Sequence, residues 1–120
     1  MSRRVAKEYL HLRDWISRAG ELVTGGEAAY MESHLLPEAG DSLLMKIGEA
    51  ANRLSKLGAM PPHGIQWSRA IDQRNWLIHQ YDNVDRDVTW ATLTRDLPVW
   101  RTSLASRFAE AEVRLADPTE

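Results

Sequence analysis

The stretch LLMKIGEAANRLSKLG, residues 43–58, decides what kind of fold this chain can form. Its apolar residues recur every three or four positions, which is the spacing of an amphipathic helix and not the alternation of a strand. Pro37 precedes it, at a place where proline is tolerated in the first turn of a helix, and Gly58 is a suitable stop at its C-terminal end. The stretch therefore predicts a helix that begins near Pro37 and ends at Gly58.

The same spacing predicts further helices on both sides of this stretch. The expected helices cover about residues 3–23, 37–58, 67–81, 87–96 and 99–116. Asp82 or Asp85 could cap the fourth helix, and Pro98 either kinks the chain or begins the fifth. Residues 25–42 show no clear pattern apart from Pro37, and no segment alternates as a strand would. We therefore expect an all-α, up-and-down bundle of four to five helices.

Length and composition predict one domain that is held together without disulfide bonds. A chain of 120 residues with 43% hydrophobic content can build a single core, which we place in residues 1–116, with residues 117–120 as a short tail. The absence of cysteine excludes disulfides and thiolate metal sites. No apolar run approaches the roughly 18 residues of a membrane span, and the N-terminus lacks the apolar stretch of a signal peptide. We expect a cytoplasmic protein.

The charge of the chain gives no general attraction to nucleic acid. Fifteen Lys and Arg residues stand against seventeen Asp and Glu residues, for a net charge of -2. A protein without an overall positive field must bind RNA through a local cluster of suitable side chains. The sequence therefore has to supply a specific site if it acts on nucleic acid.

Such a cluster is present in RNWLIHQY, residues 74–81. At about 100° per residue, Arg74 and Tyr81 share the apolar arc of the predicted helix, whereas Asn75 and His79 stack on an adjacent edge. The arc consists of Trp67, Ile71, Arg74, Ile78 and Tyr81, flanked by Ala70 and Leu77. An arginine on an apolar face needs a partner, because its charge is costly to bury alone.

Two interpretations of this helix face remain open. In the structural one the face is partly buried, Arg74 pairs with an acidic residue of a neighbouring helix, and His79 is an ordinary surface residue. In the functional one the face meets a second copy of the chain across a two-fold axis, so that two His79 side chains supply a base and an acid for cleavage of RNA through its own 2'-hydroxyl. Arg74 would hold the phosphate and Asn75 would orient it or the imidazole. No metal is required, and no metal-ligand spacing is present.

The pattern R-N-x-x-x-H-x-Y, complete here as Arg74, Asn75, His79 and Tyr81, resembles the signature of the HepT-like ribonuclease toxins of the HEPN superfamily. The segments IGEAANRLS, PPHGIQWSRAIDQRN, QYDNVDRDVTW and DLPVW also resemble the layout of that family. The resemblance extends from about residue 5 to 110, except over residues 25–42.

This resemblance implies an all-α HEPN bundle that works as a homodimer, with Arg74 and His79 as the catalytic pair in a cleft between protomers. It implies a metal-independent endoribonuclease toxin of a type VII-like toxin-antitoxin pair, which cleaves tRNA or mRNA and needs no cofactor of its own. The implied partner is a nucleotidyltransferase antitoxin of the MntA type, which uses ATP to attach AMP to Tyr81 and so inactivates the toxin. Neither a membrane nor DNA is an expected partner.

Two further residues could support this site. Glu49 could orient His79 or neutralise Arg74, although a solvated helix carboxylate is an equally ordinary interpretation. Trp76 lies off the apolar arc, where it could stack on a base, but packing against a neighbouring helix is the simpler interpretation. Two other functions also remain open: a non-catalytic HEPN module that binds a nucleotide or the nucleotidyltransferase, and a helical interaction protein in which the motif is structural.

Overall fold

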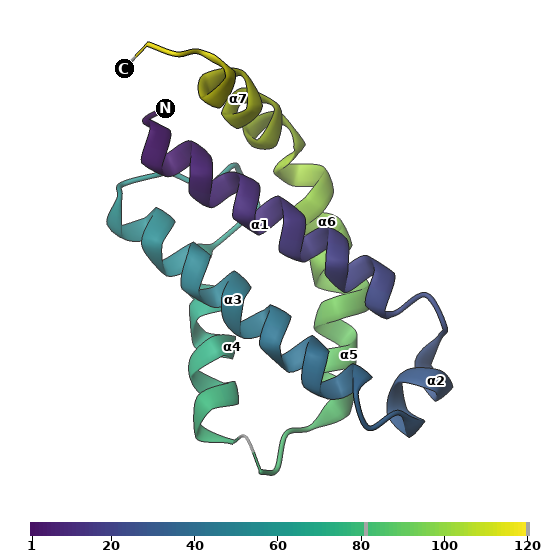
Figure 1. The fold of residues 1–120 in the computed structure, drawn as a ribbon. Coiled ribbons are helices and arrows are strands. Elements are labelled where there is room, and N and C mark those ends of the chain that lie inside the picture. The colour runs from purple at the N-terminus through teal and green to yellow at the C-terminus, as the bar shows by residue number, and fades with distance from the viewer. Residues whose placement is uncertain (81, 120) are drawn as a thin grey trace.

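Two long antiparallel helices form the centre of the molecule in this computed structural model, which describes residues 1–80 and 82–119 (Figure 1). These are α1 (Arg3–Leu22) and α3 (Leu36–Lys56), which pack side by side along their length. Helix α4 (Trp67–His79) packs against α3 after the proline-containing loop. The predicted all-helical bundle is confirmed, and the described residues form no strand.

The remaining elements complete the bundle around α1 and α3. The short helix α2 (Glu27–Glu32) links α1 to α3, and α5 (Arg86–Ala91) leads through a π-helical turn, η1 (Thr92–Asp96), into α6 (Leu97–Ser103). Helix α7 (Ala105–Ala116) then lies against α1, which brings the two ends of the chain close together (Figure 1). In the described part of the chain, no helix is long and apolar enough to cross a membrane.

The last two predicted helices are divided more finely than periodicity indicated. Pro98 lies in the first turn of α6, and because proline has no N–H it cannot form the α-helical bond to the Thr94 carbonyl. The preceding N–H, of Leu97, donates to the Thr92 carbonyl five residues back, which is the π-helical spacing. The predicted fifth helix is broken at Leu104, a fully buried residue between α6 and α7.

The break at Leu104 allows both halves of the expected helix to reach the core. Trp100, before the break, packs on Trp67, and Phe108, after it, packs on Tyr9. Tyr9 also packs on Trp67, so α1, α4, α6 and α7 meet around this group of rings. Burial among the rings raises the pKa of the Tyr9 phenol above its ordinary value. Aromatic contacts of this kind contribute beyond the area that they bury.

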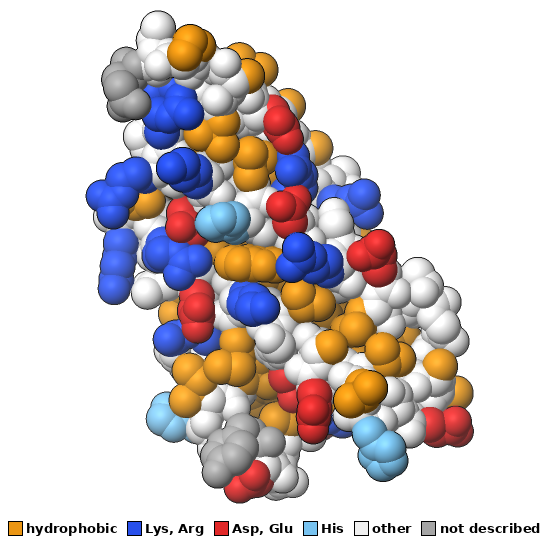
Figure 2. Space-filling model, in the orientation of Figure 1, with side chains coloured by type: hydrophobic (Ala, Val, Ile, Leu, Met, Phe, Trp, Pro, Cys, Tyr) orange, Lys and Arg blue, Asp and Glu red, His pale blue; other side chains and the backbone are white. Residues whose placement is uncertain are grey.

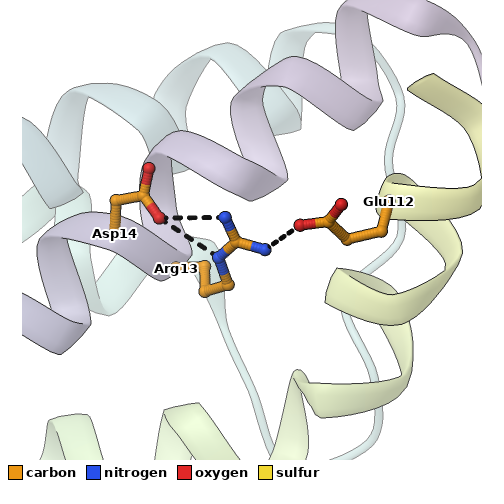
Figure 3. A network of polar contacts seen from close by, with 3 residues as sticks. All are labelled: Arg13, Asp14 and Glu112. Carbon is orange, nitrogen blue, oxygen red and sulfur yellow. Dashed lines mark hydrogen bonds and ion pairs between the residues drawn. The ribbon is translucent and has the colours of Figure 1, made fainter. Parts of the chain in front are cut away.

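Ion pairs at the surface tie together elements that lie far apart in sequence. The Arg13 guanidinium of α1 binds Asp14 and also reaches Glu112 of α7 (Figure 3). Arg86, at the start of α5, pairs with Asp41 of α3 through two short contacts of 2.6 and 2.7 Å. Because the Arg86 pair is two-thirds or more buried, it contributes more to fixing the α5 end than an exposed pair would.

Candidate functional site

The candidate site lies where α3 and α4 approach each other most closely. Gly48 of α3 is buried there, and a Cβ atom at that position would lie 2.4 Å from the Arg74 Cβ and 2.7 Å from the Ala70 carbonyl oxygen. No real side chain tolerates such contacts, so glycine is what allows this approach. The contact places the base of the Arg74 side chain against α3.

The Arg74 guanidinium is held by residues of its own chain. Its Nη1 donates a hydrogen bond of 3.0 Å to the Asn75 Oδ1, and its Nε lies 3.9 Å from the Glu49 Oε1. The Nε atom is buried and has no hydrogen-bond partner, because 3.9 Å is an ion-pair distance and too long for a hydrogen bond. Of the two roles expected for Glu49, the geometry supports neutralising Arg74, and the charge of Arg74 is therefore only partly compensated.

Asn75 and His79 lie on the side of α4 that faces solvent. Both side chains are exposed and are one helical turn apart, and His79 is the last residue of the helix. The amide and the imidazole are thus accessible to a ligand from outside the chain.

The buried side of α4 is rotated relative to the predicted apolar arc. Trp67 and Leu77 are buried, whereas Ile71 is half-buried and Ile78 is 40% exposed. The prediction that Arg74 shares the packed face of α4 agrees with its partial burial and with the approach of its Cβ to Gly48. The same prediction is wrong for Ile78, which lies on the exposed side because close packing at Gly48 turns the Ala70–Leu77 side toward α3.

Within one chain, the side chains of Arg74 and His79 do not point in the same direction from α4. Arg74 and His79 are five residues apart, which places their side chains about 140° apart around an ideal helix. Trp76 is partly buried and packs against the core, as its simpler interpretation predicted, and it also lines the cavity described below. Tyr81, the last residue of the pattern, lies outside the described residues. The three other histidines are exposed, as expected for surface or loop residues: His11, His34 and His63.

Comparison with known protein families shows which family carries this motif. The chain matches the family described as "Ribonuclease HepT-like" over residues 12–106, which include Gly48, Glu49 and the complete pattern of residues 74–81. The chain belongs to the HepT-like ribonuclease family. No solved structure matches it.

A cavity of about 440 Å³ lies on the other flank of α4 in this HepT-like chain. It is lined by α3, α4 and the α5–η1–α6 segment, with the Trp76 and Trp100 indoles among its walls. Its polar residues were not expected to form a site: Arg69, Asp72, Gln73, Thr92 and Asp96. The one feature of the sequence that points to this cavity is the four-residue spacing of Asp72 and Trp76, which places both side chains on one side of α4.

Charged side chains of both signs lie next to one another on the face shown in Figure 2, so this face carries no continuous basic surface for RNA. The contact between Arg74, Asn75 and Glu49 is therefore the feature that could attract a phosphate locally. Within residues 1–80 and 82–119, no three His, Asp or Glu side chains gather as metal ligands would.

Proposed function

We propose that this HepT-like chain is a metal-independent endoribonuclease toxin that cleaves tRNA or mRNA in a cleft between two copies of itself. One observation carries the proposal: Asn75 and His79 are exposed one turn apart, and Asn75 accepts a hydrogen bond from the Arg74 guanidinium. An imidazole, an amide and a guanidinium on accessible surface are the groups that phosphate chemistry needs. Membership of the family supports the same activity.

A second copy is part of the proposal because one copy supplies one imidazole. Cleavage through the 2'-hydroxyl needs a base and an acid on opposite sides of the phosphorus, and two His79 side chains related by a two-fold axis provide both. The exposed side of α4 also offers apolar surface for pairing, since Ile78 is 40% exposed and Ile71 is half-buried. Pairing would bury this surface beside the motif.

In the proposed reaction, a neutral His79 takes the proton of the 2'-hydroxyl, and the 2'-oxygen attacks the adjacent phosphorus. The bond from phosphorus to the 5'-oxygen breaks, and that oxygen takes a proton from the protonated His79 of the second copy. The products are a 2',3'-cyclic phosphate and a 5'-hydroxyl end. Arg74 stabilises the charge that develops on the phosphate oxygens, and Asn75 positions the guanidinium or the imidazole. Glu49 holds Arg74 in place before RNA binds.

The proposal includes control by a nucleotidyltransferase antitoxin of the MntA type in the same cytoplasm. That enzyme would transfer AMP from ATP to the phenol oxygen of Tyr81, two residues after His79 in the chain, with release of pyrophosphate and the phenol proton. Each AMP adds a phosphodiester charge that competes with RNA for Arg74, and its bulk occludes the cleft. Modification of Tyr81 would therefore act as an off switch.

The first test is cleavage of total tRNA by freshly induced, partner-free protein in excess EDTA. Intact mass first establishes that Tyr81 is unmodified. We expect wild type and His34→Ala to cut, because His34 is an exposed histidine outside the motif, and we expect His79→Ala to be slower by about a hundredfold or more. The new 3' ends should carry cyclic phosphate, and a 2'-deoxy nucleotide at the cut position should abolish cleavage.

If unmodified wild type cuts neither tRNA nor mRNA, the ribonuclease proposal fails. A non-catalytic HEPN module, which binds a nucleotide or the nucleotidyltransferase through the same face, then becomes the better explanation. One observation favours that alternative: Arg74 already has an acidic partner, Glu49, within its own chain. If Arg74→Ala mainly lowers stability and leaves partner binding intact, the motif is structural, and the chain is a helical interaction protein.

A further inference from the structure

The cavity beside Trp76 has no part in the proposed cleavage step, yet it adjoins the residues that perform it. Trp76 follows Asn75 directly and precedes His79 by three residues, which is about 4.5 Å along the helix and about 60° around it. Asp72 lies one turn before Trp76 and also lines the cavity. A nucleic acid bound at Asn75 and His79 would therefore pass the opening of this cavity.

The walls of the cavity suit a flat ring. The indoles of Trp76 and Trp100 contribute planar apolar surface, and aliphatic side chains of α3 and α6 complete the lining. Stacking of a base on an aromatic side chain is favourable for every base, because every base has a π face. The volume, about 440 Å³, is in the range of small-molecule sites.

Its polar side chains are two carboxylates, one amide, one hydroxyl and one guanidinium, from Asp72, Asp96, Gln73, Thr92 and Arg69. Asp72 and Asp96 place two carboxylates in the lining, from α4 and from the π-helical turn η1. Gln73 is oriented by a 2.7 Å hydrogen bond from its Nε2 to the Thr92 hydroxyl oxygen, so its amide is fixed at the wall. With Arg69 as the one cation of the lining, the two carboxylates leave it net negative, which disfavours phosphate. The carboxylates accept hydrogen bonds from amino groups, which adenine, cytosine and guanine carry and uracil lacks.

We propose that this cavity binds one unstacked nucleobase of the RNA, next to the phosphate that is cleaved, and that it prefers an amino-bearing base to uracil. Its role in selecting the cut position rests on the proposed ribonuclease function, whereas binding of the base itself does not. Trp76 forms the stacking wall, and Asp72 and Asp96 accept hydrogen bonds from the amino group. Val88 and Val99 are exposed at the edge of the cavity and would suit an apolar protein segment, but the two carboxylates favour the base.

The test reads the indole N–H signals of the five tryptophans by NMR in the full-length protein, with no cleavage involved. Trp76→Phe and Trp100→Phe assign the two cavity signals, and Trp15, which packs on His11 of α1, serves as an internal control. Adenosine, cytidine, uridine and ribose 5-phosphate are added separately at millimolar concentrations. We expect adenosine and cytidine to shift the Trp76 and Trp100 signals, uridine to bind about fivefold more weakly, and ribose 5-phosphate to shift neither.

Substitutions then test the acceptors. Asp72→Asn and Asp96→Asn each replace a carboxylate by an amide of the same shape, and Glu32→Gln on α2 is the matched control, because Glu32 is an exposed acid outside the cavity. We expect the two asparagine variants to lose most of the preference for cytidine over uridine and the control to keep it. In RNA that the wild type cuts, the same variants should change which base stands beside the cut.

The outcomes separate this proposal from the ribonuclease proposal. If cytidine and adenosine shift the cavity signals but no RNA is cut, the base site stands and the ribonuclease function fails. If RNA is cut but no nucleoside shifts these signals, or if ribose 5-phosphate shifts them equally, the base site is overturned. Unchanged preference in both asparagine variants would overturn the role of the carboxylates.

Discussion

Helices α1 and α4 have the same helical spacing of apolar residues, yet only α1 buries its whole stripe. Along α1 the stripe residues are at most 9% exposed: Val5, Tyr9, Leu12, Ile16 and Ala19. Along α4 only Trp67 and Leu77 are buried, and Ile78 is 40% exposed. Helix α1 is covered by α3, α6 and α7, whereas α4 packs mainly on α3. The difference indicates that α1 holds the fold together, while α4 keeps surface available for another molecule.

The largest effect on stability should come from α1, the helix that buries its whole apolar stripe. Leu12 is fully buried on α1, so Leu12→Ala removes apolar contacts and leaves a cavity, and we expect the free energy of unfolding to fall by about 3 kcal/mol. Urea unfolding followed by circular dichroism measures this loss. A loss below about 1 kcal/mol, the size expected at a partly exposed site, would show that α1 is not the centre of the core.

A smaller effect on stability should appear at Gly48, where α3 packs against α4. Gly48→Ala places a methyl group against the Arg74 Cβ and the backbone of α4, and α4 has to move away. We expect a net loss of about 1–2 kcal/mol in unfolding free energy, because strain exceeds the gain in helix propensity. The displaced Arg74 should also lose its contact with Glu49.

Gly20→Ala is the matched control for this substitution. Gly20 also lies inside a long helix, but a Cβ atom there meets nothing within 4 Å. Alanine should therefore stabilise this position by up to about 1 kcal/mol through helix propensity alone. If both alanine variants were equally stable relative to wild type, close packing of α3 on α4 would be disproved.

Periodicity predicted the helices well but not how each one is turned. The limits of α1 and α3 follow from their stripes, and Gly58 follows the end of α3 as predicted. Asp85, one of the two expected alternatives, caps α5, because its carboxylate accepts a hydrogen bond from the Asp87 N–H. The apolar residues of α4 occupy a broad arc, and the contact at Gly48 decides which part is buried. That contact depends on a helix distant in sequence, so no local pattern could reveal it.

The motif itself could be found from sequence, whereas its surroundings could not. Side-chain types at fixed spacing identified Arg74, Asn75 and His79, since spacing along one helix is a local property. The pairing of Arg74 with Glu49 was one of the two expected possibilities, and the structure selects it. The cavity was missed because Asp96 reaches it from η1, whose π-helical register arises from Pro98 and not from an apolar pattern.

The smallest effect on stability should come from the exposed side of α4. Ile78→Ala should change the free energy of unfolding of the isolated chain by about 1 kcal/mol or less, because the side chain is already 40% exposed. If this face pairs with a second copy, the same variant should weaken self-association measured by sedimentation. Val113→Ala on α7 is the control, since Val113 is 72% exposed on another helix and should leave self-association unchanged. A loss of stability as large as that of Leu12→Ala would show that Ile78 belongs to the core and that the apolar stripe of α4 is as fully buried as that of α1.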